Sequence, residues 1–207
     1  GAKREIMKKE TILFWNVDTQ YDFMCNDKSF KGVLPIKGAK KIEKNLGVLT
    51  DFALNEGILI VSTADWHTPE SKEFSDNPDF KTTFPPHCLQ KTKGAMFIPA
   101  TNYFIDCSFE WAEEFYGKKD AFNRLRESNI TKDVKHIVIY KDDFDVFKGN
   151  PYTNEILKII KPTVAIVYGV ATNVCVDYAV LGLIKRKIKF LLLFYQPWYE
   201  DRSRSHL

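Results

Sequence analysis

A cysteine at the start of a predicted helix is the residue of this sequence with the clearest potential for chemistry. Residues 164–186, VAIVYGVATNVCVDYAVLGLIKR, run from an apolar segment through a turn of small residues into a segment with apolar residues at helical spacing. Cys175 falls in the first turn of that helix, where unsatisfied N–H groups and the helix dipole stabilise a thiolate, and Thr172 or Asn173 can serve as the N-cap. The cysteine is therefore either an activated nucleophile or, as for most free cysteines, a small buried apolar residue.

Polar residues also follow three other predicted strands. They are Asp18 after residues 11–17, Asp65 and His67 after residues 58–64, and Lys141 after residues 136–140. Taken alone, each could be a strand-end cap or a surface residue. In a parallel sheet, however, the carboxyl ends of the strands share one edge, and ligands bind beyond that edge. We therefore expect these residues to meet Cys175 in one site.

The residue types at this edge suit a cysteine hydrolase, which needs a thiolate, a proton carrier and donors for an oxyanion. Cys175 can be the nucleophile, and Asp18 can be the base that takes its proton. Lys141 would hold the thiolate and the carboxylate together electrostatically. The backbone N–H groups of Ala171 and Cys175 are placed to receive the oxyanion.

A second group of residues has the composition of a divalent metal site. Asp65 and His67 are separated by one residue, so in an extended chain both side chains leave the same face. His87, in the Pro-stiffened turn FPPHC, could complete the set, and Glu73 is a plausible fourth ligand. One carboxylate and two imidazoles suit Zn, Fe or Mn and do not choose among them. Cys88 could compete for the metal, although we expect this thiol to be packed instead.

Two aromatic residues close in sequence to these candidates could wall a substrate pocket. They are Phe23 and Phe84. Each could equally belong to an ordinary core, but their neighbours Asp18 and His87 make the pocket worth testing.

Strands and helices are predicted to alternate along the chain. We expect strands over residues 11–17, 58–64, 136–140, 164–168 and 188–195, and helices over residues 37–55, 151–160 and the segment that contains Cys175; residues 108–128 would form one or two helices interrupted at Gly117. A long loop follows the second strand to about residue 99, and loops of that length tend to be functional. Short, continuously apolar strands between helices indicate a three-layer α/β/α fold with a doubly wound, mainly parallel sheet.

Composition narrows the class of protein. The 207 residues suit a single domain, 1–207, with a flexible tail over residues 1–10. The net charge is only +3 and the charges are scattered, which argues against nucleic acid and an anionic membrane as partners. The sequence has no apolar run of membrane-spanning length and no secretory signal, and its four cysteines lack CxxC pairing, so we expect a cytoplasmic protein with reduced thiols.

Several segments of the chain resemble the nicotinamidase/pyrazinamidase branch of the isochorismatase-like cysteine hydrolases. They are VDTQYDF at 17–23, ADWH at 64–67, FPPHC at 84–88, the strand-end Lys141, and GVATNVCV at 169–176. The last segment is typical of the superfamily, whereas DWH followed by PPHC is more specific for nicotinamidases. The chain departs from the family in three places: DDFDVF follows Lys141 instead of the Gly, Tyr and Ser common in nicotinamidases, the 101–135 segment is longer, and the C-terminus, 196–207, is atypical.

The resemblance implies the isochorismatase-like fold and hydrolysis of nicotinamide to nicotinate and ammonia through a thioester acyl-enzyme, a reaction of NAD salvage. It implies a catalytic triad of Asp18, Lys141 and Cys175. A related hydrolase of another small amide, ureido or carbamoyl compound stays open as an alternative, as does a non-catalytic relative that binds a metal or a ligand. A homo-oligomer also stays open.

The resemblance also implies further features of the site. One divalent metal, Zn first with Fe or Mn as alternatives, would be held by Asp65, His67 and His87. A non-prolyl cis peptide between Val170 and Ala171 would aim the oxyanion N–H groups. In addition, Glu73 falls where some members place a further ligand, and Phe84 where many carry Trp.

Overall fold

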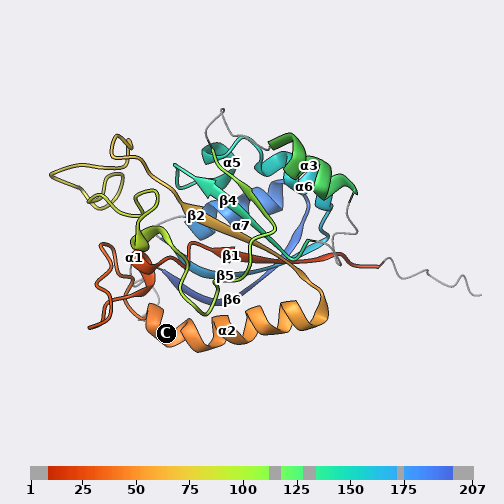
Figure 1. Cartoon of the computed structure of the whole chain (residues 1–207), viewed down its shortest axis with the longest axis horizontal. Helices are drawn as coiled ribbons and strands as arrows, with labels where there is room; N and C mark the ends of the chain where they lie inside the picture. Colours follow the sequence, from red (N-terminus) through yellow and green to blue (C-terminus); the bar gives the residue numbers. More distant parts are fainter. Residues whose placement is uncertain (1–8, 112–117, 128–133, 172–174, 198–207) are drawn as a thin grey trace, which may run out of the picture.

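The computed structural model describes residues 9–111, 118–127, 134–171 and 175–197 (Figure 1). Residues 1–8, 112–117, 128–133, 172–174 and 198–207 lie outside this description. Four predicted features lie wholly or mostly in these residues: the tail, the break at Gly117, the N-cap at Thr172 or Asn173, and the atypical C-terminus. Within the described ranges, no helix is both long enough and apolar enough to cross a membrane.

In the described part of the chain, six strands form one sheet in which every neighbouring pair is parallel. They are β1 (Ile12–Val17), β2 (Leu59–Asp65), β3 (Cys107–Phe109), β4 (His136–Lys141), β5 (Val164–Ala171) and β6 (Lys189–Pro197), in the order β3-β4-β2-β1-β5-β6. Five of them match the predicted strands, and the predicted parallel α/β architecture is confirmed. The chain places β2, the edge strand β3 and then β4, between these two, on one side of β1, and it crosses to the other side with β5. The sheet therefore has its switch point between β1 and β5.

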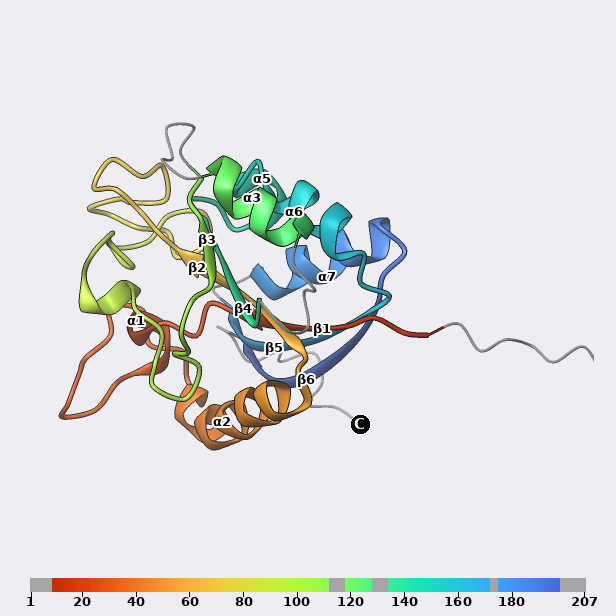
Figure 2. The ribbon, with the colours of Figure 1, turned by 45° about the vertical axis from the view of Figure 1, so that its right-hand side comes forward.

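Helices cover both faces of this sheet (Figure 1, Figure 2). One face carries α2 (Ala39–Glu56), and the other carries α3 (Lys118–Glu127), α5 (Val146–Gly149), α6 (Thr153–Ile160) and α7 (Cys175–Lys185). Strand β1 alternates between the two: Leu13 and Trp15 pack with residues of α6 and α7, whereas Phe14 packs with residues of α2. Both faces need apolar residues because both are covered, which explains the continuously apolar strand sequences.

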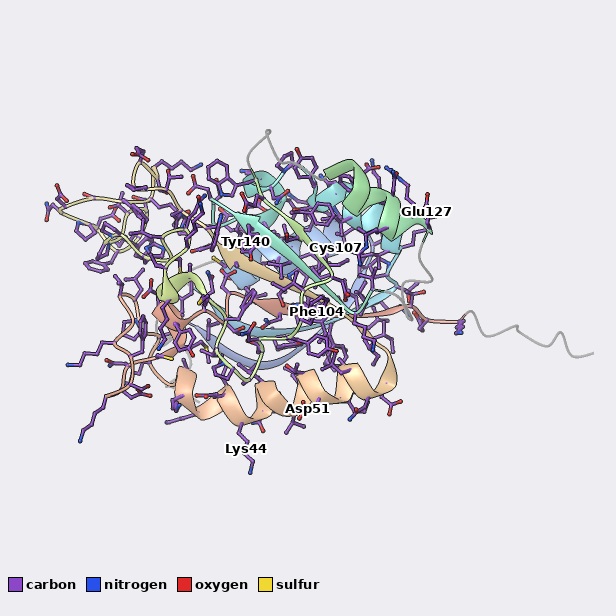
Figure 3. The ribbon with its side chains drawn as sticks, viewed as in Figure 1. Lys44, Asp51, Phe104, Cys107, Glu127 and Tyr140 are labelled. Atoms are coloured by element: carbon purple, nitrogen blue, oxygen red, sulfur yellow. The ribbon has the colours of Figure 1, made fainter. Side chains whose placement is uncertain are left out.

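The apolar residues of helix α2 recur at helical spacing and lie on one face of the helix. Ile42 and Leu46 are buried against the sheet. Lys44 and Asp51 point away from it, on the exposed side of the helix (Figure 3). The helix ends at Gly57, which adopts the left-handed φ of 65° that is common where helices stop. The predicted helix over residues 37–55 is therefore confirmed.

The 101–135 segment differs from the prediction. The spacing of its apolar residues predicts a helix from residue 108, but residues 107–109 form the edge strand β3, where Cys107 is paired with Ile137 and Phe109 with Ile139 of β4. A helix follows only later, as α3. Three residues are too few to show a strand period, and the partners that make them a strand lie far along the chain.

The short helix α1 (Tyr21–Met24), the 3₁₀ turn η1 (Lys93–Ala95) and the loop between β2 and β3 gather at the carboxyl edge of the sheet (Figure 1). Backbone hydrogen bonds hold this region together. The N–H of Tyr21 donates to the Met96 carbonyl oxygen at 2.9 Å, and the N–H of His67 donates to the Cys88 carbonyl oxygen at 3.1 Å. The long loop is thus fixed at the edge where ligands are expected to bind.

Gly169 allows β5 to approach β1 closely near this edge. Its φ is 126°, and a Cβ atom added to it would lie 2.2 Å from the carbonyl oxygen of Val17. Val17 directly precedes Asp18, so the close approach determines where the Asp18 backbone lies. A side chain at position 169 would have to push the two strands apart.

We expect Gly169→Ala to lower the free energy of unfolding by roughly 2–4 kcal/mol, because it combines an unfavourable φ with a backbone clash. Urea denaturation followed by circular dichroism measures this change. The matched control is Gly47→Ala in the middle of α2, where the new Cβ would meet only the Ala100 side chain at 3.8 Å. That control should be stabilising by about 0.5–1 kcal/mol. Equal effects of the two substitutions would contradict the proposed close approach.

Candidate active site

Three side chains from strand ends and one from the start of α7 meet at the carboxyl edge of the sheet. The Lys141 ammonium, at the end of β4, donates a hydrogen bond to Asp18 Oδ2 at 3.0 Å and another to Asp65 Oδ1. Its Nζ also lies 3.6 Å from Cys175 Sγ. All four side chains are buried, and only 1% of the Lys141 surface is exposed. The structure thus brings Asp18, Lys141 and Cys175 together, while their catalytic roles stay a prediction.

Asp18 is held by β2 as well as by Lys141. Its φ is 52°, in the left-handed region that few non-glycine residues adopt. Its N–H donates to the Thr63 carbonyl oxygen at 3.1 Å, and the Thr63 hydroxyl donates to Asp18 Oδ1 at 2.7 Å. Because Thr63 binds both the backbone and one carboxylate oxygen, the other oxygen stays directed at Lys141.

Burial and charge set the protonation of this cluster. Burial acts to lower the pKa of Lys141, but the charges of Asp18, Asp65 and Cys175 outweigh it and raise that pKa well above its ordinary value. Burial raises the pKa of Asp18, an effect that Lys141 opposes and Asp65 strengthens. Lys141 is therefore a lasting cation. Asp18 binds a proton more readily than an exposed aspartate does, which suits a group that must take a proton and return it.

A second cluster lies next to the first and shares Asp65 with it. Asp65 Oδ2 lies 3.3 Å from His67 Nε2 and 3.5 Å from His87 Nε2. Glu73 Oε2 lies 3.4 Å from His67 Nε2 and 4.0 Å from His87 Nε2. One ligand atom from each of the four buried side chains falls within 4.8 Å of the other three. The structure therefore gathers all four residues that the sequence nominated as metal ligands.

The donor atoms of this cluster fit a divalent cation. Asp65 Oδ2, His67 Nε2 and both Glu73 carboxylate oxygens form no hydrogen bond among the residues described, although buried polar atoms are normally paired. The other ring nitrogens are occupied: His87 Nδ1 lies 2.8 Å from a backbone carbonyl oxygen, and His67 Nδ1 lies 2.5 Å from Asp142 Oδ1. An imidazole that donates from Nδ1 keeps a lone pair on Nε2, as a metal ligand requires.

The electrostatics of the cluster also favour a cation. Burial, strengthened by the charge of Asp65, raises the pKa of Glu73 to about 8. Burial acts to lower the pKa of His67, but the hydrogen bond to Asp142 and the nearby carboxylate of Asp65 outweigh it and raise that pKa to about 10. The negative field that draws a proton to His67 would also draw a metal ion, which displaces that proton when it binds.

Comparison with known proteins gives a sequence match over part of the chain. No family model matches. Over 84 residues the chain is 33% identical to the nicotinamidase/pyrazinamidase of Mycobacterium tuberculosis, a match that covers 41% of this chain and 42% of that protein. The chain thus spans about two fifths of the length of this curated relative.

Solved structures share the fold over most of the chain. The pyrazinamidase of Pyrococcus horikoshii in complex with zinc matches with a TM-score of 0.67 at 22% identity, covering 92% of this chain and 89% of that one. An isochorismatase-like hydrolase from Alkaliphilus metalliredigens has a TM-score of 0.63 at 18% identity, with 92% and 85% covered. The chain has the isochorismatase-like fold. With the sequence match, the predicted resemblance to the nicotinamidase/pyrazinamidase branch is confirmed.

A third solved structure widens the range of relatives with the isochorismatase-like fold. N-carbamoylsarcosine amidase from Thermoplasma acidophilum has a TM-score of 0.60 at 15% identity, covering 88% of this chain and 81% of that one. At this identity the likeness concerns the fold, so the substrate has to be argued from the site itself.

The two predicted pocket residues lie beside the second cluster. Phe23 and Phe84 are fully buried, and their ring centroids lie 5.6 Å and 5.9 Å from that of His87. They support the histidine, and their contact with a substrate stays a prediction. Cys88 is buried outside the cluster with its Sγ 3.8 Å from the Gly94 carbonyl oxygen, so it is packed as expected.

The predicted oxyanion groups lie where β5 leads into α7. Val170 is buried, and Cys175 is the first residue of α7, in agreement with the expected helix start. Ala171 ends β5 and borders residues 172–174, which are outside the described ranges. Among the described residues there is no cis peptide bond. The cis peptide predicted between Val170 and Ala171 is therefore not found in this structure, in which β5 continues through both residues.

Sequence reasoning gave no role to Gln20, which holds Asp65 in place. The Gln20 side-chain amide donates to the carbonyl oxygen of Asp65 at 2.7 Å and to that of Ala95 at 2.9 Å, and its oxygen accepts the Asp65 N–H at 2.8 Å. Gln20 is buried and belongs to the VDTQYDF segment, two residues after Asp18. The signal available in the sequence was a polar residue just after a strand for Gln20, and a hydroxyl residue within an apolar strand for Thr63.

We expect Gln20→Ala to lower the free energy of unfolding by about 3 kcal/mol, because three buried backbone groups would lose their partner. Chemical denaturation of both proteins measures the difference. Gln90→Ala is the control: Gln90 makes one longer, part-buried contact, from its amide to the Trp66 carbonyl oxygen at 3.4 Å. It should cost less than about 1 kcal/mol. A Gln20 variant as stable as the Gln90 variant would mean that the clamp on Asp65 is unimportant.

Proposed function

We propose that the chain is a metal-containing cysteine amidohydrolase that converts nicotinamide and water to nicotinate and ammonia. The observation that carries this proposal is the buried Lys141 ammonium, whose Nζ lies 3.0 Å from Asp18 Oδ2 and 3.6 Å from Cys175 Sγ. A thiol, a proton-binding carboxylate and a cation that favours the thiolate are the parts a cysteine hydrolase needs. The sequence match to a nicotinamidase/pyrazinamidase supports the choice of substrate.

In the first half of the reaction, Asp18 takes the proton of Cys175, and the thiolate attacks the carboxamide carbon. Lys141 favours the thiolate because its ammonium remains charged. The negative charge that develops on the carbonyl oxygen would be received by the N–H groups of Ala171 and Cys175. Asp18 then gives its proton to the departing nitrogen, the C–N bond breaks, and ammonia leaves a thioester on Cys175.

In the second half, water attacks the thioester carbon while Asp18 takes a proton from that water. The same N–H groups would receive the oxyanion. The C–S bond then breaks, nicotinate forms, and Cys175 leaves as a thiolate beside Lys141. One carboxylate thus serves both halves, alternating between base and acid.

Asp65, His67, His87 and Glu73 would hold one divalent cation, with Zn as the first expectation and Fe or Mn as alternatives. When bound, the cation supplies a Lewis acid that can hold a ring nitrogen and so orient the substrate, which is a positioning role. The zinc complex of the similar P. horikoshii pyrazinamidase supports this choice. All four cysteines are buried, and none forms a disulfide in the part of the chain that the structure describes, which supports a reducing, cytoplasmic setting, where such an enzyme would act in NAD salvage.

A second candidate is hydrolysis of another small amide, or of a ureido or carbamoyl compound, by the same thiol. The shared fold of N-carbamoylsarcosine amidase favours keeping it. A third candidate, a ligand-binding relative without turnover, would keep the metal and lose the chemistry. Ammonia release from nicotinamide, pyrazinamide and a series of ureido compounds separates the three. Release from the ureido compounds alone would reject the nicotinamidase proposal, and release from none of them would favour the binding relative.

Cys175→Ala and Asp18→Ala should each reduce ammonia release from nicotinamide by about 10³-fold or more, because both residues act in the same chemical steps. Circular dichroism spectra should remain those of the parent protein. Cys107→Ala is the matched control, since Cys107 is also buried but lies on β3, away from the cluster. It should retain near-parental activity. Near-parental rates for either site variant would remove the residue from the proposed mechanism.

Purified protein should contain about one divalent metal ion per chain, and the double variant His67→Ala, His87→Ala should contain less than about a tenth of that. This pair leaves Asp65 in place, so the contact between Asp65 and Lys141 is preserved. Inductively coupled plasma mass spectrometry measures the content. Asp51→Ala, an exposed carboxylate variant on α2, serves as control. Equal metal content in all three proteins would locate the metal elsewhere.

A further inference from the structure

Asp142 lies directly behind one of the two histidines of the metal-binding cluster. Its Oδ1 is 2.5 Å from Nδ1 of His67, on the side of the ring opposite to Nε2. The Ser71 hydroxyl donates to the same carboxylate oxygen at 2.7 Å and lies 3.2 Å from His67 Nδ1. The His67 ring therefore has a charged hydrogen-bond partner of its own, which is itself held by a hydroxyl group.

The hydrogen bonds around Asp142 assign the protons of this group. The carboxylate can only accept, so His67 Nδ1 carries the hydrogen between them. Ser71 uses its one hydrogen on Asp142, so it does not donate to the ring. In the form that binds a metal, His67 Nε2 therefore has its lone pair directed toward Asp65 Oδ2 at 3.3 Å and Glu73 Oε2 at 3.4 Å.

The two histidines of the cluster differ in what supports them. His87 Nδ1 faces the neutral carbonyl oxygen of Pro85 at 2.8 Å, whereas His67 Nδ1 faces a carboxylate. A carboxylate behind an imidazole fixes its tautomer and ring orientation and makes it a stronger metal ligand. His67 is thus the better supported of the two.

The backbone fixes where Asp142 can be. It directly follows Lys141, the last residue of β4, and the Lys141 carbonyl oxygen accepts the N–H of Trp66 at 2.9 Å. Trp66 in turn lies between Asp65 and His67. The end of β4 therefore supplies the ammonium of one cluster and, one residue later, the carboxylate behind the other.

We infer that Asp142 is a positioning residue for the metal ligand His67, and that it tightens binding of a divalent cation by this chain. The inference rests on the metal site of the proposed function. It concerns a position where this chain departs from the residues common in nicotinamidases, since Asp142 opens the DDFDVF segment. Asp142, the first residue of the segment that differs, would thus have a physical role in this chain.

The neighbouring Asp143 provides a matched control. The side chains of Asp142 and Asp143 are equally exposed, at 22%. Asp143, however, pairs with the exposed Lys72, whose Nζ lies 2.8 Å from Asp143 Oδ2. Its Oδ1 accepts the N–H of Asp145 at 3.0 Å. Replacement of either residue removes the same charge from the same short segment, but only one replacement removes the partner of His67.

The test is the dissociation constant of Zn²⁺, measured on the full chain by competition with a chromophoric chelator. Asp142→Ala should weaken binding by about 10–100-fold, the usual cost of losing such a partner, while Asp143→Ala should stay within about 2-fold of the parent. Asp142→Asn keeps an acceptor for His67 but loses the charge, so it should fall between parent and Asp142→Ala. With Co²⁺ in place of Zn²⁺, the visible absorption bands should shift for the Asp142 variants and not for Asp143→Ala.

The outcomes separate this inference from the proposed function. Parental Zn²⁺ affinity in both Asp142 variants would overturn the inference and leave the metal site intact. A parent protein that binds no Zn²⁺ and no Co²⁺ would overturn the inference and the metal site together. Thermal unfolding of the metal-free proteins is the check on folding; should Asp142→Ala fail to fold, the isosteric Asp142→Asn decides the question through the same affinity and absorption measurements.

Discussion

A single buried ammonium group determines how this site is built. Lys141 is only 1% exposed, and a charge removed from water must find partners of opposite charge. Its partners are the carboxylates of Asp18 and Asp65 and the sulfur of Cys175. These come from the ends of β1 and β2 and from the start of α7. The Lys141 ammonium can therefore be buried only when these side chains are assembled around it.

Asp65 joins the two clusters because its two oxygens face different ways. Oδ1 accepts from Lys141, whereas Oδ2 faces the imidazoles of His67 and His87. The carboxylate can do this only while its backbone is held, and Gln20 binds both the N–H and the carbonyl oxygen of Asp65. In the proposed reaction, the candidate metal cluster would orient the substrate and Cys175 would attack it. The shared Asp65 would thus keep these two parts of the site at a constant separation, as reaction from a bound geometry demands.

Much of this arrangement could be predicted from the sequence because parallel sheets place strand ends at one edge. Asp18, Asp65 and Lys141 each interrupt an apolar run, so their convergence follows from the fold class alone. The positions of His87 and Glu73 were less certain, because they lie in a long loop whose path depends on contacts from other segments. Their gathering beside Asp65 could be suggested only by residue type.

What the sequence could not predict depends on pairings between distant parts of the chain. Strand β3 has three residues and no readable period, and it exists because β4 lies beside it. Asp142 reads as one of several acids after a strand, and only the coordinates reveal that its oxygen faces His67. Gln20 reads as a polar loop residue until Asp65, far along the chain, is found against it.

The candidate metal cluster of Asp65, His67, Glu73 and His87 and the Cys175 thiol differ in how much of the folded chain each one needs. The four donor side chains come from one continuous segment, 65–87, so only short loops have to close to bring them together. Cys175, by contrast, joins Lys141 only after β5 has paired with β1, a contact between opposite ends of the chain. During synthesis on the ribosome, the loop with its donors would emerge well before the cysteine, and the nucleophile would be the last component to arrive. A growing chain would thus lack the assembled cluster of Asp18, Lys141 and Cys175 until β5 and the start of α7 have been made.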